Sequence, residues 1–290
     1  MILFLGTIFA GLLGLAFGSF LNVCLSRWPE GESIALPRSH CRQCGRTLTW
    51  WENVPLLSWL ALRGRCRTCR VWIGWRYPVV ELAVGALWAG CWYKFATPAM
   101  FDDSTGALAA AGLKIVGLAI FYWLLVGLAA LDAKHLWLPD AVTLPGIVLG
   151  VVFTVLSGSV FATAESHRPP VSVLLGSAFS ILAAAGIILL IRWIYWLIRR
   201  REGIGLGDAK LMALLGAWLG FPGALLAFGL GVVLGAVAAV VLLAIPSARH
   251  DSDSWAMSKL PLGTFLCIGG IVSSQWGERI IAAYLRWAGF

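Results

Sequence analysis

Two aspartates stand where long apolar segments begin or end. Asp208 follows glycines at every second position in GIGLGDAK, and Asp132 ends an apolar run at the start of LDAKHLWLPD. Glycine lets backbones approach closely, so Gly205 and Gly207 are expected to let this loop reach the other aspartate and an extended peptide. Lys210 is expected to contact lipid headgroups or to balance the local charge.

Paired carboxylates are suited to cleaving a peptide bond. One takes a proton from water while the other, protonated, polarises the scissile carbonyl, and two adjacent acids share one proton. Because they titrate as a pair, the sequence does not say which is acid and which is base. The pair predicts an aspartyl protease at a membrane surface, against the alternative of two unrelated interfacial acids. A phosphate-binding loop is disfavoured because no Gly-Lys-Ser/Thr follows the glycines.

Four cysteines form a second cluster. Two C-x2-C knuckles, Cys41/Cys44 and Cys66/Cys69, are separated by twenty-one residues, which predicts a structural tetrahedral zinc site. Two disulfides are the alternative, disfavoured in a reducing cytoplasm. Neighbouring arginines are expected to lower the pKa values of the thiols. The other cysteines are expected to pack in the core: Cys24, Cys91 and Cys267.

The composition is that of a polytopic membrane protein. Hydrophobic residues make up 60% of the chain, charged residues only 12%, and the mean hydropathy is +0.85, whereas soluble domains are about 25% charged. The net charge of +8 lies in a few loops rather than on one basic face, which argues against nucleic-acid binding. About eight transmembrane helices are expected, at 2–25, 77–95, 107–132, 139–156, 171–198, 208–219, 222–245 and 260–287.

The chain divides into three predicted parts: a first helix at 1–26, an arginine-rich insert at 27–76, and the membrane protease helices at 77–290. The insert holds nine arginines and three acids, and Arg199 to Arg201 follow the fifth helix. By the positive-inside rule the insert, Asp132 and Asp208 face the cytoplasm and both termini lie outside.

Two polar residues lie within or beside the apolar runs. Asn22, near the end of the first helix, either bonds to a neighbouring helix or has a function. Glu81, one turn inside the second helix, is expected to face the bundle and to pair with a residue such as an arginine.

With these motifs in chain order, the chain resembles the bacterial type IV prepilin peptidases, membrane aspartyl proteases of the GxGD class. The matching stretches are GSFLNVCLSRWPE, the paired cysteine knuckles, RYPVVELAVG, LDAKHLWLPD and GIGLGDAKLMALLGAWLG. The resemblance implies that Asp132 and Asp208 are catalytic and that Asp140 is not. The chain departs from the family in PLGTFL, where Thr264 stands at a frequent second proline, and this leaves the packing of the last helix open.

The resemblance also implies substrates, a second activity and a location. The enzyme would cleave the basic leader of type IV prepilins and of type II secretion pseudopilins at the bacterial inner membrane, in contact with lipid. It would then methylate the new N-terminus with S-adenosylmethionine. No methyl-donor fold is recognisable in the sequence, so the donor site would be built from the insert and helix ends, with Asn22 and Arg27 as candidates.

Two other classes are weighed against this hypothesis. A polytopic ion-coupled transporter would use the intramembrane charges Asp132, Glu81, Arg192 and Asp208 as a path. Both strong acids are predicted at one interface rather than at the midplane, and no inverted repeat is visible, which argues against transport. A metal-stabilised scaffold for an envelope machine would need neither aspartate.

Overall fold

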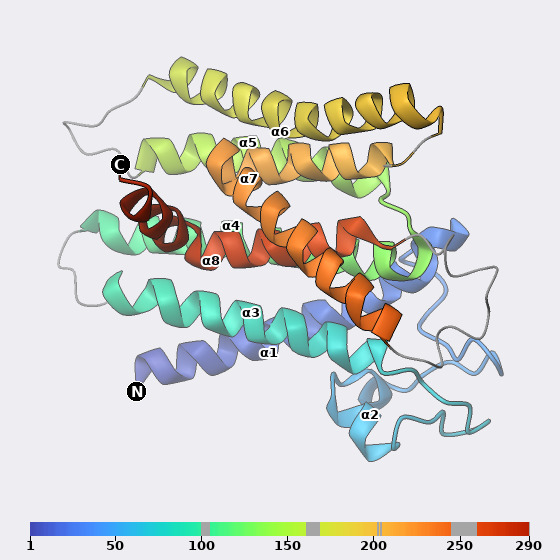
Figure 1. The fold of residues 1–290 in the computed structure, drawn as a ribbon. Coiled ribbons are helices and arrows are strands. Elements are labelled where there is room, and N and C mark those ends of the chain that lie inside the picture. The colour runs from blue at the N-terminus through green and yellow to red at the C-terminus, as the bar shows by residue number, and fades with distance from the viewer. Residues whose placement is uncertain (100–104, 161–168, 202, 204, 245–259, 290) are drawn as a thin grey trace. The chain divides into compact units, whose positions relative to one another are not determined.

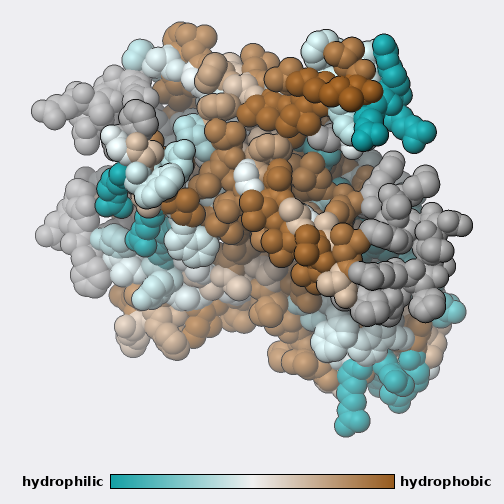
Figure 2. All heavy atoms as spheres, in the orientation of Figure 1, coloured by the Kyte–Doolittle hydropathy of each residue, from teal (hydrophilic) through white to brown (hydrophobic). Residues whose placement is uncertain are grey.

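The computed structural model describes residues 1–99, 105–160, 169–201, 203, 205–244 and 260–289 (Figure 1). All long elements in these ranges are α-helices, and five are long and apolar enough to cross a membrane. Figure 2 shows hydrophobic side chains over the outer surfaces of the helices and hydrophilic ones toward their ends. The all-α polytopic membrane class predicted from composition is confirmed. The five candidate spans are Ile2–Glu30, Gly106–His135, Asp140–Gly158, Pro170–Arg199 and Leu206–Ala244.

The chain forms two compact units, Met1–Gly127 and Leu128–Phe290. The first unit contains α1 (Ile2–Arg27), η1 (Trp28–Glu30), η2 (Trp50–Asn53), α2 (Leu57–Ala61), α3 (Arg76–Ala99) and most of α4 (Thr105–His135). The second contains the end of α4, α5 (Asp140–Val160), α6 (Pro170–Arg199), α7 (Leu206–Ala244) and α8 (Leu262–Trp287).

Close helix packing defines the membrane part of the first unit. A Cβ added at Gly18 of α1 would lie 2.7 Å from the Cα of Glu81, so α1 and α3 approach each other at backbone distance. The indole N–H of Trp88 in α3 donates to the carbonyl of Ala119 in α4 at 3.0 Å. Small residues and interhelical hydrogen bonds are the contacts that hold helices together in lipid.

The insert between α1 and α3 contains a small aromatic cluster. Trp59 lies with its ring centroid 5.7 Å from that of Trp72 and 4.4 Å from that of Trp75. The Trp59 indole N–H donates to the carbonyl of Ile73 at 3.0 Å. These rings give a segment of mostly polar composition some apolar packing of its own.

A buried carboxylate connects the first knuckle to η2. Glu52 pairs with Arg46 and accepts the backbone N–H of Thr49 at 2.8 Å and its hydroxyl at 2.7 Å. Burial acts to raise the pKa of Glu52, but the Arg46 guanidinium and the two Thr49 donors overcome it and lower that pKa to about 2.

One element of the second unit changes direction. The backbone of α7 is non-helical at Gly220, with φ 69° and ψ 174°, and Pro222 follows. Figure 1 shows the two arms of α7, lighter and darker orange, meeting at a sharp bend. Ser273 of α8 supports the bend by donating to the carbonyl of Gly223 at 2.8 Å. The two helices predicted on either side of this turn are therefore the two arms of α7.

The packing of α8 on α7 depends on one glycine, which gives a test of the fold. A Cβ added at Gly269 would lie 2.3 Å from the carbonyl oxygen of Ala227. We expect Gly269→Ala to destabilise the protein by roughly 1–3 kcal/mol, because backbone would have to move. The control Gly229→Ala, whose added Cβ would meet nothing within 4 Å, should unfold at the wild-type temperature or above. Thermal unfolding in detergent measures both, and equal midpoints would contradict this packing.

Candidate active site and metal site

The two aspartates predicted from the sequence lie near each other in the second unit. Asp132 is in the last turn of α4, with only 6% of its surface exposed, and Asp208 is in the first turn of α7. They are close enough for their charges to interact. Cys267 of α8 is fully buried and lies within electrostatic range of both. The helix ends thus bring together two acids that are separated widely in the sequence.

The first turn of α8 fixes the orientation of Asp132. The backbone N–H of Thr264 donates to Asp132 Oδ2 at 2.7 Å. Its hydroxyl lies 3.2 Å from the same oxygen and 3.0 Å from the carbonyl oxygen of Ala129, and these two acceptors share its one hydrogen. The Gly263 N–H also bonds to the carboxylate. The first N–H groups of a helix have no partner inside the helix, so a carboxylate is favoured there.

In the sequence Thr264 stands out only as a departure from the family pattern, which does not predict its contact with Asp132. The available signal was its position three residues after Pro261, where a helix N-terminus is expected to need an acceptor. A proline at this position would supply neither the N–H nor the hydroxyl.

Glycines allow the close packing around the acids. A Cβ added at Gly263 would lie 2.9 Å from Asp132 Oδ2, and one added at Gly207 would lie 3.2 Å from the Cβ of Leu138. Asp208 accepts the backbone N–H of Gly205. The glycine loop therefore contacts the segment after α4 at Gly207, and a side chain at Gly263 would crowd the Asp132 carboxylate.

Lys210 pairs with an acid of the second unit. Its Nζ lies 2.5 Å from Oδ1 of Asp140, in the first turn of α5, and both side chains are partly exposed. The expected local charge balance is therefore present, and it uses Asp140 rather than either acid of the pair.

The four predicted metal ligands converge in the first unit. The sulfur atoms of Cys41, Cys44, Cys66 and Cys69 all lie within 4.8 Å of one another, and all four cysteines are free thiols. The Cys41 and Cys69 sulfurs are 3.8 Å apart, close to the edge of a tetrahedron with Zn–S bonds of about 2.3 Å. The cluster can hold a metal ion, and two disulfides are not formed. As expected, Cys24, Cys91 and Cys267 are buried in helices.

The two knuckles share one backbone geometry. The residue after the second cysteine of each is left-handed, Gly45 with φ 71° and Arg70 with φ 57°. Backbone N–H groups of Cys69 and Thr68 lower the pKa of the Cys66 thiol to about 6. The charge of Arg46 also interacts with the Cys66 and Cys44 sulfurs, as expected of a neighbouring arginine, but the N–H groups within the knuckle have the larger effect on Cys66.

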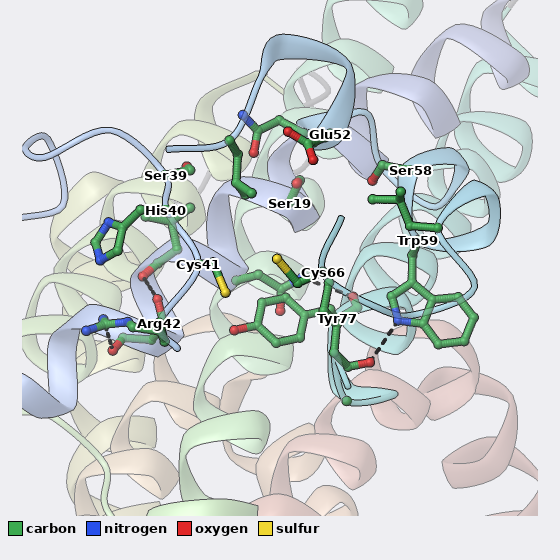
Figure 3. A pocket seen from close by; sticks show the side chains of 18 of the residues that line it. Ser19, Ser39, His40, Cys41, Arg42, Glu52, Ser58, Trp59, Cys66 and Tyr77 are labelled. Atoms are coloured by element: carbon green, nitrogen blue, oxygen red, sulfur yellow. Dashed lines mark hydrogen bonds between the residues drawn. The ribbon is translucent and has the colours of Figure 1, made fainter. Parts of the chain in front are cut away.

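A cavity with apolar walls and a few polar groups lies between the insert and the ends of α1 and α3 (Figure 3). Asn22 donates to the carbonyl of Tyr77 at 3.0 Å, so it makes the predicted bond to a neighbouring helix. Glu81 accepts the backbone N–H of Leu56 at 2.9 Å and also bonds to Ser19 and Asn22. The arginine partner expected for Glu81 is not found among the described ion pairs, because the insert supplies a backbone donor instead.

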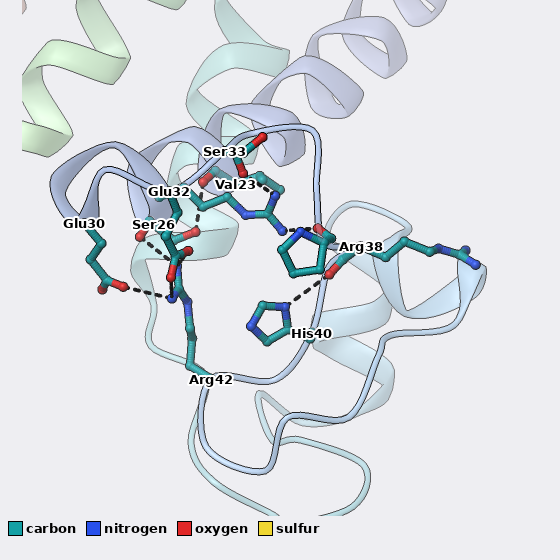
Figure 4. Close-up of polar contacts among 10 residues, drawn as sticks. Val23, Ser26, Glu30, Glu32, Ser33, Arg38, His40 and Arg42 are labelled. Carbon is teal, nitrogen blue, oxygen red and sulfur yellow. Dashed lines mark hydrogen bonds and ion pairs between the residues drawn. The ribbon is translucent and has the colours of Figure 1, made fainter.

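Two arginines join the end of α1 to the insert. Arg27 is buried and donates to the carbonyls of Ser33 at 2.8 Å and of Pro37 at 2.5 Å. Arg42 pairs with Glu30 at 2.9 Å and with Glu32 at 2.8 Å (Figure 4). It also donates to the backbone carbonyl at the end of α1. Both cations hold the first knuckle against the helix end.

Comparison with known proteins gives consistent matches along the chain. Residues 12–95 match the bacterial peptidase A24 N-terminal domain, and residues 119–240 match the type IV leader peptidase family. No solved structure matches the chain. Three similar proteins bear the name prepilin leader peptidase/N-methyltransferase. The protein of Pseudomonas aeruginosa is 33% identical over 96% of this chain and 93% of its own length. The protein of Stutzerimonas stutzeri is 33% identical over 95% of this chain and 92% of its own length. The protein of Burkholderia pseudomallei strain 1026b is 38% identical over 93% of this chain and 85% of its own length.

Both family models match in chain order, and the second includes Asp132 and Asp208. The three relatives exceed 30% identity over more than nine tenths of the chain. No comparison supports the transporter hypothesis. This protein therefore belongs to the type IV leader peptidase family.

Proposed function

We propose that this protein cleaves the leader from type IV prepilins and methylates the new N-terminus. Its relatives carry the name prepilin leader peptidase/N-methyltransferase. The observation that carries the proposal is the proximity of Asp132 and Asp208 at two helix ends. Pseudopilins of type II secretion carry the same kind of leader and are proposed as further substrates.

We assign proton transfer to one oxygen of Asp132. Its Oδ2 accepts the backbone N–H of Thr264 at 2.7 Å, so in this proposal Oδ1 is the oxygen that exchanges a proton with water or with the other acid. One carboxylate of the pair removes a proton from the attacking water, and the protonated partner polarises the scissile carbonyl. Two acids this close cannot both ionise without cost, so they share one proton.

The methylation half requires a methyl donor, for which we propose S-adenosylmethionine. Bound to the enzyme, it supplies an electrophilic methyl group: the neutral amine of the new N-terminus forms an N–C bond, the C–S bond breaks to leave S-adenosylhomocysteine, and a proton leaves the nitrogen. The residues of the first unit fit such a ligand, because the buried Oδ1 of Asn22 has no partner among the described residues. Asn22 and Arg27 are the proposed contacts.

We propose zinc as the ion of the tetracysteine cluster and assign it a structural role. Four thiolates complete a tetrahedral shell, which leaves no open position for a substrate. Several apolar side chains of the insert are exposed, among them Trp50, Leu57 and Trp75, so its own core is small and the metal would contribute to its folding.

We place the enzyme in the inner membrane, in contact with lipid, with both termini outside and the acids at the cytoplasmic face. Nine arginines in the insert support this orientation. A prepilin keeps its basic leader in the cytoplasm ahead of an apolar helix, so its cleavage point would meet the acids there.

The catalytic assignment is tested by exchanging single acids. Asp132→Asn and Asp208→Asn keep the side-chain shape and remove the shared proton, so each should reduce cleavage at least about 100-fold. The N-terminal mass of a co-expressed prepilin measures cleavage and methylation together. The control is Asp140→Asn, an exposed acid of the same helix-end region that pairs with Lys210, and it should keep cleavage. Near-normal cleavage by either variant of the pair would overturn the assignment.

The metal proposal is tested by elemental analysis. Purified protein should contain about one zinc per chain. The double variant Cys41→Ser/Cys66→Ser should lose the metal, whereas Cys24→Ser/Cys91→Ser, which alters two buried cysteines outside the cluster, should keep it. Full metal content in the first double variant would rule this site out.

The orientation is tested by labelling intact cells with a membrane-impermeant thiol reagent. Cysteines introduced at Leu206 or Leu136, both exposed in the structure, should stay unlabelled until the cells are lysed. A cysteine at Ala288, near the C-terminus, should be labelled from outside, with the parent protein correcting for native thiols. Labelling at Leu206 or Leu136 in intact cells would place the acids on the wrong side of the membrane.

A further inference from the structure

The cavity of the first unit has the size and position of a small-molecule site. Its volume is about 340 Å³, and its walls come from the ends of α1 and α3 and from both knuckles (Figure 3). Ligand sites are commonly concavities of about 300–1,000 Å³ lined by apolar and aromatic side chains with a few polar groups. Every lining residue lies within Met1–Gly127, so one compact unit builds the whole cavity.

One buried group in this cavity lacks a partner. Asn22 is 3% exposed, and its amide nitrogen donates to the carbonyl of Tyr77. Its Oδ1 is buried and accepts no hydrogen bond from any residue that the structure describes. A buried acceptor left unpaired costs free energy. An N–H donor of a ligand in the cavity would remove this cost.

Charges of both signs also line the cavity. The Glu81 carboxylate is 7% exposed, and its described partners are neutral donors rather than a lysine or an arginine. The buried Arg27 guanidinium is held by two backbone carbonyls rather than by a described carboxylate. A ligand that carries both a cation and a carboxylate would therefore find an opposite charge for each group.

Aromatic rings also line the cavity, beside the unpaired acceptor and the charged groups. Trp59, Trp72 and Tyr77 are among the lining residues, and Figure 3 shows the Tyr77 ring near Cys41 and Cys66, with Trp59 to one side. Aromatic faces stack on nucleobases and attract cations. A nucleoside phosphate fits less well, because no glycine-rich phosphate loop lines the cavity and the lining Arg42 is already paired with Glu30 and Glu32.

We propose that this cavity binds the methyl donor, with Asn22 Oδ1, Glu81 and Arg27 as its polar contacts. This rests on the proposed methyltransferase function. S-adenosylmethionine carries an adenine with N–H donors, a cationic sulfur, an ammonium and a carboxylate, which match the unpaired acceptor, the acid, the guanidinium and the rings. Two metal ligands, Cys41 and Cys66, also line the cavity, so its wall depends on the folded knuckles.

The test is the affinity of purified, zinc-loaded, full-length protein in detergent for S-adenosylhomocysteine, the unreactive product, by isothermal titration calorimetry. Asn22→Leu should raise the Kd at least tenfold, because it removes the unpaired acceptor. Asn53→Leu is the matched control: Asn53 also lines the cavity but is exposed, and its amide bonds locally to Thr49. This variant should bind within twofold of wild type. Adenosine triphosphate should not bind.

Glu81→Gln is a second probe that keeps the side-chain shape and removes the charge. It should raise the Kd for S-adenosylmethionine at least fivefold. Zinc content and the unfolding temperature of each variant show that the insert remains folded. Wild-type affinity in both Asn22→Leu and Glu81→Gln, or equal affinity of the wild type for adenosine triphosphate, would overturn the cavity assignment.

The two proposals fail in different ways. A wild-type protein that methylates a co-expressed prepilin while the cavity variants keep full affinity places the donor elsewhere and leaves the methyltransferase function standing. A wild-type protein that neither binds S-adenosylhomocysteine nor methylates a cleaved prepilin removes both proposals. Loss of affinity confined to Asn22→Leu and Glu81→Gln supports the cavity.

Discussion

The site of the second unit depends on one carboxylate meeting one helix N-terminus. Asp132 is buried, and burying a carboxylate without donors is unfavourable. The first N–H groups of α8, at Gly263 and Thr264, are donors that the helix itself cannot satisfy. The Asp132 carboxylate therefore needs the N–H donors of α8, and these N–H groups need an acceptor. The pairing fixes where α8 begins. Since α8 packs closely on α7 through Gly269, it also constrains the helix that carries Asp208.

The sequence predicts well those features that residues close together in the chain determine, such as helices, the break in α7 and the cysteine knuckles. The long apolar runs become helices, and the break in α7 falls at Gly220, where glycine and a following proline interrupt the helix. The four cysteines converge because each knuckle is a local turn, closed by bonds such as Gly45 N–H to the carbonyl of Cys41 at 2.9 Å. The local context also places the two acids at helix ends, Asp132 where α4 ends and Asp208 where α7 begins.

What the sequence does not predict is which distant groups become partners. Thr264 bonds to an acid 132 residues earlier in the chain; its place after Pro261 indicates a helix N-terminus that needs an acceptor, but not which acid supplies it. Glu81 was expected to need a cation, yet the fold brings the N–H of Leu56 to it across the insert. The low pKa of Cys66 has the same character, because its largest causes are the backbone N–H groups of Cys69 and Thr68, whose direction the sequence does not give.

The described polar contacts around Asp132 and those around Glu81 and Asn22 fall in separate units. The described hydrogen bonds to Asp132 come from residues within Leu128–Phe290. Those to Glu81 and from Asn22 stay within Met1–Gly127. Backbone groups of helix ends hold the carboxylate of Asp132. The cavity with Asn22 and Glu81 lies against the two knuckles, whose cysteines can hold a metal. A change in the cysteine cluster therefore acts first on the walls of the cavity, while the donors that orient Asp132 remain those of its own unit.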